Sequence, residues 1–346
     1  MASRRLYGEP AQGRVNPYPS TKLLCMETAT ARVQIRKPFS LFSTVVSHGW
    51  YQTEPFRWLQ DNVLVRAERL HDGRVMVVRM EEGASKRANH KDVSLTVIGE
   101  GADDPGVATE MARRVAVILR ADEGLQPFYA LCRTVPDLRE ARRLGAGRCM
   151  RAPSLWEDVI KTVLSTNVNW RQAVTMSNRL AQLGEPAPAD PTLRAWPTPG
   201  QVVRAGERFL RDVVRAGYRA PYIMELARQQ KSGEIDLDSL DAASPKMTEK
   251  ELFAALVALR GIGKSSAHFL MNLLGHYDHL PVDSATYAYA QRHFFRGKRP
   301  TEKQIRRRFA RYGKWQSLVY WFERWEPRLA WWEVPPNGDK KLKAVS

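Results

Sequence analysis

The sequence predicts an α+β protein in which a β-rich segment precedes a longer helical one. Between residues 62 and 99, short runs of strand-forming residues occur, the first two joined by an Asp-Gly turn signal. After residue 150 the apolar spacing becomes helical, and a Ser or Thr followed three residues later by Glu or Gln repeatedly marks a helix start. A break containing two glycines at 261–263 separates two of these helices.

Three strands and one helix are expected in the β-rich segment. Asn62–Leu70 and Arg74–Met80 are joined by His71-Asp72-Gly73, and Asp-Gly is a frequent hairpin turn. Val93–Gly99 is a third strand, and a helix follows around Thr109–Leu119. The expected parts of the chain are a tail or loosely attached arm at 1–36, a β-rich domain at 37–150, a helical core at 151–334 and a disordered tail at 335–346.

Start and stop signals place the helices of the core. Ser154 and Glu157 form a capping-box pair ahead of an apolar helical face. Thr248 and Glu251 repeat the pattern before the first helix of the glycine hairpin. Three further boundaries follow in the same way: a helix at Lys264–Leu274, its stop at Gly275, and a later helix start at Thr301.

Composition restricts the class of protein. The formal net charge is +17 and the sequence pI is near 10.0, which fits a polyanion-binding protein, although a merely basic surface would give the same balance. The three cysteines, Cys25, Cys132 and Cys149, form no Cys-x-x-Cys pair, so neither disulfides nor a metal site is expected. No apolar run approaches the roughly 20 residues that span a bilayer, and no signal-peptide core is present. We therefore expect an intracellular protein without a membrane partner.

The segment from Leu259 to Asp283 is the most informative part of the chain. It opens with Leu-Arg-Gly-Ile-Gly-Lys-Ser-Ser-Ala. Glycines allow a sharp turn and bring bare N–H groups against an anion at the positive end of the following helix. Asp283 comes 18 residues after Ser265, on a Leu-Pro-Val connection. A phosphate-binding turn followed by one carboxylate suggests chemistry on a nucleotide.

This arrangement resembles the helix-hairpin-helix–Gly/Pro–Asp (HhH-GPD) superfamily of DNA base-excision glycosylases. The matched positions are Leu259, Gly261, Ile262, Gly263, Ser266, Ala267, Pro281 and Asp283. The resemblance implies that the hairpin binds the DNA backbone and that Asp283 is the catalytic carboxylate. The hairpin residues that it assigns to backbone binding are Gly261, Ile262, Gly263, Lys264, Ser265 and Ser266.

The resemblance also implies a fold. A β-rich (TBP-like) N-terminal domain is expected, followed by a two-lobed all-α HhH-GPD core with double-stranded DNA in the cleft between the lobes. The motif match covers residues 155–330, and the order of elements extends the likeness to 37–150. The cysteines cannot supply the four-cysteine iron–sulfur cluster of one branch of the family. No cofactor is expected beyond a monovalent cation at the hairpin when DNA is bound, and the protein is expected to be a monomer.

Asp283 has two compatible interpretations. Asp is a favoured N-cap, and residues 284–294 fit the helix that would follow. The catalytic interpretation starts from the reaction, because cleavage of an N-glycosidic bond passes through a sugar cation. A fixed carboxylate stabilises that charge and positions the attacking water.

Ser265 departs from one branch of the family. Members that also cut the DNA strand carry Lys at this motif position and form a Schiff base with the sugar. Here the neighbouring Lys264 is displaced by about 100° around the helix, as follows from 3.6 residues per turn. We therefore expect a monofunctional glycosylase that uses water, with Lys264 on a phosphate; the alternative is that Lys264 bends round to act as the amine.

The residues around Asn167 resemble the segment that fills the gap left by an extruded nucleotide. By its position Asn167 is that wedge; the alternative is a helix end whose side chains bond to the local backbone. Trp170, Trp315 and Trp321 are candidates for the base pocket, although aromatic faces at helical spacing are commonly core. The stretch Gly217–Ala220 also resembles a family segment and is interpreted as structural.

These expectations converge on removal of a damaged base from duplex DNA. Alkylated purine is the first choice of lesion, because a positively charged leaving group needs only one carboxylate. Oxidised guanine is the alternative, favoured by Asn167. A non-catalytic HhH DNA-binding protein is the rival outside enzymes, but such a clamp would not require Asp283 at this separation.

Overall fold

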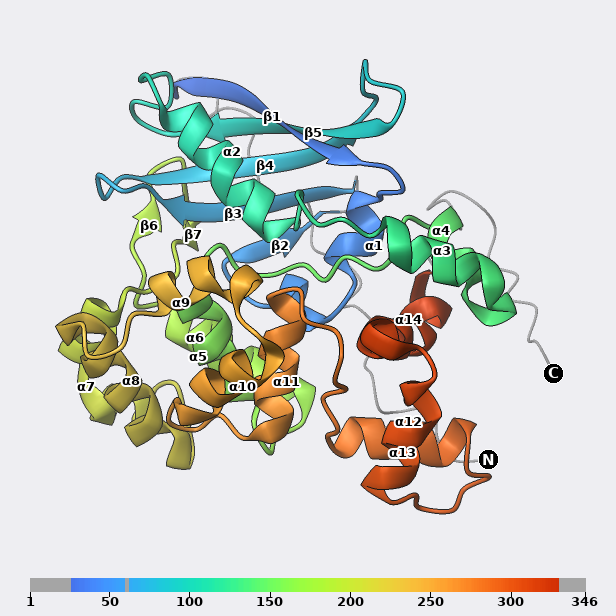
Figure 1. The fold of residues 1–346 in the computed structure, drawn as a ribbon. Coiled ribbons are helices and arrows are strands. Elements are labelled where there is room, and N and C mark those ends of the chain that lie inside the picture. Colours follow the sequence, from blue (N-terminus) through green and yellow to red (C-terminus); the bar gives the residue numbers. More distant parts are fainter. Residues whose placement is uncertain (1–25, 60–61, 330–346) are drawn as a thin grey trace, which may run out of the picture.

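The computed structural model describes residues 26–59 and 62–329, with side chains described up to residue 324. A five-stranded antiparallel sheet with the order β1-β5-β4-β3-β2 forms the N-terminal part (Figure 1). Its strands are β1 (Thr28–Arg36), β2 (Phe56–Trp58), β3 (Val63–Arg69), β4 (Val75–Gly83) and β5 (His90–Ile98). The three predicted strands correspond to β3, β4 and β5.

The first strand corrects one prediction. Residues 28–36, assigned from the sequence to a tail or loose arm, form β1 and pair along their whole length with β5, from Thr28 opposite Ile98 to Arg36 opposite His90. Val33 and Ile35 are buried there. Residues 1–25 and the predicted tail at 335–346 lie outside the described residues.

Both faces of the sheet are covered, which explains why β3 is buried along almost its whole length and β4 along its first six residues apart from Arg79. One face carries Leu64, Met76 and Val78 and packs on α2 (Val107–Ile118) and the helical core. The opposite face carries Val63, Val65 and Ala67 and packs against a short hairpin within the helical part. That hairpin consists of β6 (Pro186–Ala187) and β7 (Asp190–Arg194). This hairpin was not predicted from the sequence.

The helices beyond the sheet form two groups (Figure 1). The first group contains α5 to α11, which pack on one another. The second contains α12, α13 and α14, and α14 packs against the turn that connects α3 with α4. The bounds are α1 (Leu41–Val45), α3 (Gln126–Thr134), α4 (Arg139–Arg143), α5 (Leu155–Ser165), α6 (Trp170–Ala181), α7 (Pro199–Asp212), α8 (Ala220–Ser232), α9 (Leu237–Ala243), α10 (Glu249–Ala258), α11 (Lys264–Leu273), α12 (Ser284–His293), α13 (Glu302–Ala310) and α14 (Gln316–Leu329). The α+β class is confirmed.

Buried ion pairs join the sheet to α5. Arg66 on β3 donates to both carboxylate oxygens of Glu157, at 3.0 and 2.6 Å, and Lys161 lies 2.7 Å from the same group. All three side chains are at most 2 % exposed. Burial alone would raise the pKa of Glu157, but Arg66 and Lys161 hold it below its ordinary value. The carboxylate therefore stays ionised between the domains.

This pairing changes the role predicted for Glu157. Ser154 caps α5 and accepts from the Glu157 N–H at 3.4 Å. The Glu157 carboxylate does not return to the N-cap, because it is bound to Arg66 and Lys161. Half of the predicted capping box is therefore present, and the other half is replaced by a domain contact.

Candidate active site

The glycine hairpin joins α10 and α11, as the sequence predicts. A complete capping box between Thr248 and Glu251 starts α10. The helix ends at Leu259, whose carbonyl accepts from the Ile262 N–H at 3.0 Å. Ile262 is buried in the core. The buried side chain of Ile262 thus holds the hairpin against the core, and the two glycines lie on the side of the turn that faces the surface.

The two hairpin glycines serve different purposes. Gly261 has φ +86°, and an added Cβ would lie 3.0–3.4 Å from the ring of Tyr222, so the backbone requires glycine there. Gly263 has φ −88°, and no atom lies within 4 Å of an added Cβ. The conformational explanation is therefore confirmed for Gly261 and wrong for Gly263. Gly263 is exposed, so its missing side chain leaves the turn open to close approach from solvent.

The N-terminus of α11 has no side-chain cap. Within the described residues, no hydrogen bond is made by the N–H groups of Lys264, Ser265 and Ser266, and the ladder begins with Ala267 donating to Gly263. Lys264 is exposed, whereas Ser265 and Ser266 are half-buried. Free N–H groups at a helix start, with an exposed ammonium beside them, form an anion-binding arrangement.

Asp283 is the N-cap of α12, which confirms the first of its two interpretations. Its Oδ1 accepts from the Thr286 N–H at 2.7 Å and from the Thr286 hydroxyl at 2.8 Å. The residue is exposed, whereas Thr286 is buried beneath it. Oδ2 receives no hydrogen bond from the residues that the structure describes. One carboxylate oxygen is thus held by the protein and the other is available to a ligand.

A chain of donors leads to this carboxylate from α14. Arg324 Nη1 donates to the Tyr320 hydroxyl at 2.9 Å, and that hydroxyl lies 2.9 Å from Thr286 Oγ1. Thr286 Oγ1 also donates to the Pro281 carbonyl at 2.9 Å, so its one hydrogen is shared between that carbonyl and Asp283, and Tyr320 donates to Thr286. Burial, with Asp283 nearby, raises the pKa of Tyr320, so its phenol keeps its proton. The polarised chain stabilises negative charge on Asp283.

A row of aromatic rings in contact with one another extends from Tyr320. Trp321 lies 5.5 Å from the Tyr320 ring and 6.0 Å from Phe269 on α11, measured between ring centroids. Phe269 contacts Trp50 at 5.3 Å, and Trp170 stacks on Trp50 at 6.1 Å with an interplanar angle of 17°. We call Trp50, Trp170, Phe269 and Trp321 the aromatic cluster. It brings together two of the three tryptophans predicted for the pocket, and the sequence analysis missed Trp50 and Phe269.

His48 completes the cluster as an uncharged ring. It lies 5.6 Å from Phe269 and 5.3 Å from Trp50. Its Nε2 is bonded to the Met150 carbonyl, and its Nδ1 accepts from the Trp50 N–H at 3.4 Å. Both contacts suit the neutral tautomer with hydrogen on Nε2. Burial lowers the pKa of His48 to about 4, so the ring is neutral at pH 7.

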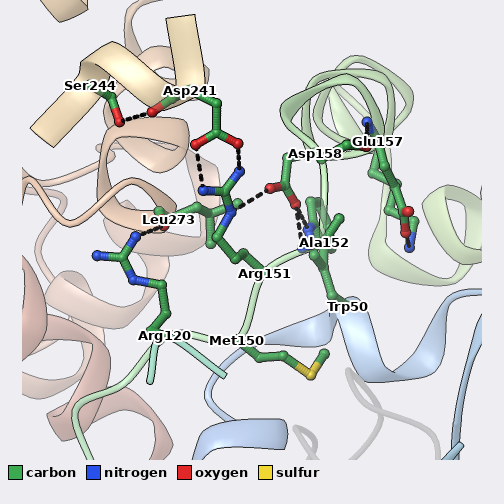
Figure 2. A network of polar contacts seen from close by, with 12 residues as sticks. Trp50, Arg120, Met150, Arg151, Ala152, Glu157, Asp158, Asp241, Ser244 and Leu273 are labelled. Atoms are coloured by element: carbon green, nitrogen blue, oxygen red, sulfur yellow. Dashed lines mark hydrogen bonds and ion pairs between the residues drawn. The ribbon is translucent and has the colours of Figure 1, made fainter. Parts of the chain in front are cut away.

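A buried polar network holds Trp50 in place (Figure 2). Asp158 on α5 accepts from Trp50 Nε1 at 2.8 Å, from the Ala152 N–H at 3.0 Å and from Arg151 Nε at 3.2 Å. Arg151 in turn makes a bidentate pair with Asp241 on α9, at 2.8 and 2.6 Å. The network fixes the indole of the N-terminal domain against two helices of the core.

Trp315 lies apart from the aromatic cluster. Its ring contacts Phe128 on α3 at 5.7 Å and stacks on Tyr277 at 6.0 Å. The structure therefore gives Trp315 a packing role between α3 and the start of α14, which is the core alternative considered for these tryptophans.

Asn167 lies in the turn after α5 and has φ +48°. Its side chain is exposed and its Nδ2 donates to the Tyr218 hydroxyl at 3.1 Å. Local backbone capping is performed by Asn169 instead, which accepts from the Gln172 N–H at 2.9 Å. Arg219 bonds to the Thr166 carbonyl and so ties the two turns together. The wedge assignment of Asn167 stays a prediction, and Tyr218, 47 % exposed, is its unpredicted neighbour.

Metal binding, membrane spanning and thiol chemistry have no site among the described residues. Within the described part of the chain, no three His, Cys, Asp or Glu side chains gather in a way that could hold a metal ion. No helix among the same residues has the length and apolar character needed to cross a membrane. Burial raises the pKa of both Cys132 and Cys149 to about 12, so these thiols are unreactive at neutral pH. Cys25 lies outside the described residues.

Comparisons place this geometry among known proteins. No family model matches the chain. DNA-3-methyladenine glycosylase of Bacillus subtilis is 24% identical over 206 residues, which are 58% of this chain and 67% of that protein. The structure of 3-methyladenine DNA-glycosylase from Archaeoglobus fulgidus matches with a TM-score of 0.67 and 17% identity, over 86% of this chain and 98% of that one.

An 8-oxoguanine glycosylase/lyase is almost as similar in fold. The apo-form of the Clostridium acetobutylicum protein matches with a TM-score of 0.63 and 17% identity, over 86% of this chain and 96% of that one. Its complex with dsDNA containing cytosine opposite to 8-oxoG matches with a TM-score of 0.60, at 16% identity, over 87% of this chain and 98% of that one. The fold is thus shared by enzymes named for different lesions.

Proposed function

We propose that this chain, a homologue in sequence and fold of the HhH-GPD DNA glycosylases, flips a damaged base out of duplex DNA and hydrolyses its N-glycosidic bond. The observation that carries the proposal is the setting of Asp283. Its carboxylate is exposed and is held at one oxygen by donors that reach back to Arg324. The reaction would be the first step of base excision repair, inside the cell.

Each part of the site has a role in this reaction. The free N–H groups of Lys264 to Ser266 and the open surface at Gly263 bind a phosphate of the backbone. Asn167 fills the space left in the stack when the nucleotide turns out. Asp283 stabilises the sugar cation through Oδ2 and positions the water that attacks it. The donor chain from α14 holds this carboxylate in one orientation.

Alkylated purine is the proposed lesion. Such a base carries a positive charge, and aromatic faces attract cations by about 0.5–2 kcal/mol, more when water is excluded. Trp170, Phe269 and Trp321 offer half-buried faces, and His48 beside them is neutral, so it does not repel a cation. Oxidised guanine is the second candidate, because Asn167 rather than an apolar residue stands at the wedge position.

The same proposal excludes strand cleavage by a lysine. Ser265 occupies the lyase position, and Lys264 is exposed at the first residue of α11, where its ammonium suits a phosphate. We expect an intact abasic strand as the product, cut only after alkali or heat. Trapping a covalent protein–DNA adduct with borohydride would contradict this, and Lys264→Ala would then identify the amine.

The hairpin also fits the monovalent cation expected when DNA is bound. Within the described residues, the carbonyls of Gly261 and Ile262 accept no backbone hydrogen bond, and carbonyl oxygens are ligands that hard cations prefer. Such an ion would add positive charge beside the phosphate. Its presence stays a prediction.

A panel of duplexes tests the proposed function, each with one defined lesion. The protein is incubated with each duplex, and released base and abasic strand are measured. Release of an alkylated purine, faster than of 8-oxoguanine or any undamaged base, is the expected result. Release of 8-oxoguanine alone would replace the substrate, and binding without release from any duplex would favour the non-catalytic DNA-binding alternative.

A further inference from the structure

A hollow of about 600 Å³ lies beside α3 and α4, away from the candidate active site. Cys132 is buried and Pro38 half-buried, whereas the arginines at the hollow are exposed. The residues that line it are Pro38, Cys132, Arg133, Arg139, Arg142 and Arg143. We call these four arginines the α3–α4 arginine cluster.

The cluster has more positive charge than its neighbours neutralise. Arg143 pairs with Glu140 at 2.5 Å. Among the described residues, no ion pair or side-chain hydrogen bond is made by Arg133, Arg139 or Arg142. Guanidinium groups that share one hollow repel one another, and an anion between them removes the repulsion. Their planar forks match the oxygens of a phosphate group.

Exposure of these side chains decides which phosphate is bound. A small anion at a site open to water gains little, because charge pairs there are worth at most about 1 kcal/mol. A polyanion gains affinity from every counterion that the arginines displace. The cluster is therefore suited to a nucleic acid backbone and poorly suited to a free phosphate. Duplex DNA is the polyanion that the proposed function supplies.

In Figure 1, α14 lies between α3 and α4 on one side and α12 and α13 on the other. On one side of α14, Tyr320 bonds to Thr286 beside Asp283. On the other side, Phe128 of α3 contacts Trp315 at the start of the helix.

We propose that the α3–α4 arginine cluster binds the DNA backbone outside the candidate active site. This inference rests on the proposed function for the identity of the polyanion. It lengthens the footprint on one side of the lesion and adds affinity without contacting the damaged base.

The test compares two variants with the same change in charge. Arg139→Glu/Arg142→Glu alters the cluster. Arg87→Glu/Arg113→Glu is the control, because both of its arginines are exposed, on the β4–β5 loop and on α2. Binding to an undamaged 30-base-pair duplex is measured over a range of salt. We expect the cluster variant to bind at least about tenfold more weakly than the control, with a salt slope smaller by about 2.

Two further arms make the result decisive. Lesion duplexes too short to extend beyond the candidate active site should bind both variants alike, and inorganic phosphate at constant ionic strength should not displace the 30-base-pair duplex. Equal binding of the long duplex by the two variants would overturn the proposal. It would also be overturned if the cluster variant differed from the control only in its binding of inorganic phosphate or of an oligoglutamate. The salt slope needs no base release, so a chain without glycosylase activity would end the proposed function and leave this test intact.

Discussion

The interface between the sheet and the helical core differs from the hairpin surface in how it treats charge. At the interface Arg66, Glu157 and Lys161 are buried and matched, and Asp158 accepts three hydrogen bonds. At the hairpin, α11 starts without a cap and Lys264 is exposed, although α7, α10, α12 and α13 all have capping boxes. The charges at the interface pair with one another and hold the domains together, whereas the polar groups of the hairpin remain available to a ligand.

The difference predicts two separate kinds of variant. Changes at the interface should lower stability and leave the chemistry of the folded protein intact. Changes at the hairpin surface should weaken DNA binding and leave stability intact. A variant that changed both the stability and the DNA affinity would show that the two regions are coupled.

Glu157→Gln should give the largest effect. It leaves Arg66 and Lys161 buried without their shared carboxylate, and breaking a buried ion pair costs about 3–5 kcal/mol. Urea unfolding measures the loss. Glu207→Gln is the control, because its pair with Arg211 is exposed and worth less than about 1 kcal/mol. A loss for Glu157→Gln no greater than that of the control would mean that the interface does not depend on this pair.

His48 should make stability depend on pH. Its pKa is lowered to about 4 in the folded protein, so above pH 6.5 it is neutral in both states and contributes nothing. As the pH falls from 6.5 toward 4, His48 binds a proton in the unfolded chain but stays neutral in the folded protein. Stability is therefore lost across this window, by about 2–3 kcal/mol at pH 4.5.

Comparison of the parent with His48→Gln isolates the contribution of His48 to the pH dependence of stability. Burial raises the pKa of Asp158 to about 6, so Asp158 acts in the opposite direction within the same window, and it is present in both proteins. The difference in unfolding free energy between the variant and the parent should shift by about 2–3 kcal/mol in favour of the variant from pH 7 to pH 4.5. A constant difference would show that His48 titrates normally.

Gly263→Asp should separate binding from stability most cleanly. The side chain has room, and Asp is a favoured N-cap, so thermal stability should stay equal or rise slightly. The new carboxylate occupies the anion site, so affinity for all duplexes should fall by about 1–3 kcal/mol. Gly263→Asn supplies the cap without the charge as the control. Unchanged affinity in Gly263→Asp would remove the hairpin from phosphate binding.

Asn167→Ala should have the smallest effect and the most selective one. Because the side chain is needed only when a nucleotide is extruded, affinity for lesion duplexes should fall by about 1 kcal/mol more than affinity for undamaged ones. Titration of matched duplexes measures the difference. Equal losses on both would leave Asn167 as a residue of the turn that holds Tyr218.

The elements of the fold that were predicted from the sequence are those with local signals. The strands β3 to β5, the caps at Thr248 and Thr301 and the hairpin turn depend on neighbours a few residues apart, and all were predicted. The edge strand β1 was missed because its partner β5 lies about 60 residues away. The β6–β7 hairpin was missed because it is short and interrupts a helical region.

The same distinction holds within the candidate site. Asp283 and Gly261 were found because a motif fixes their spacing. Thr286, Tyr320 and Arg324 were missed, because the donor chain to Asp283 joins α12 to α14 across 34 residues between Thr286 and Tyr320. Phe269 and Trp50 became visible only when α11 and the N-terminal domain were brought into contact.

The rate of base release by Asp283→Asn tests the central claim most directly. Asn is also a good N-cap, so α12 should remain folded while the negative charge is lost. With saturating protein on a duplex that the parent cleaves, we predict that release slows by at least about 100-fold, while DNA affinity stays within a few fold of the parent. Retention of half the parental rate would contradict the assignment of Asp283 as the catalytic carboxylate.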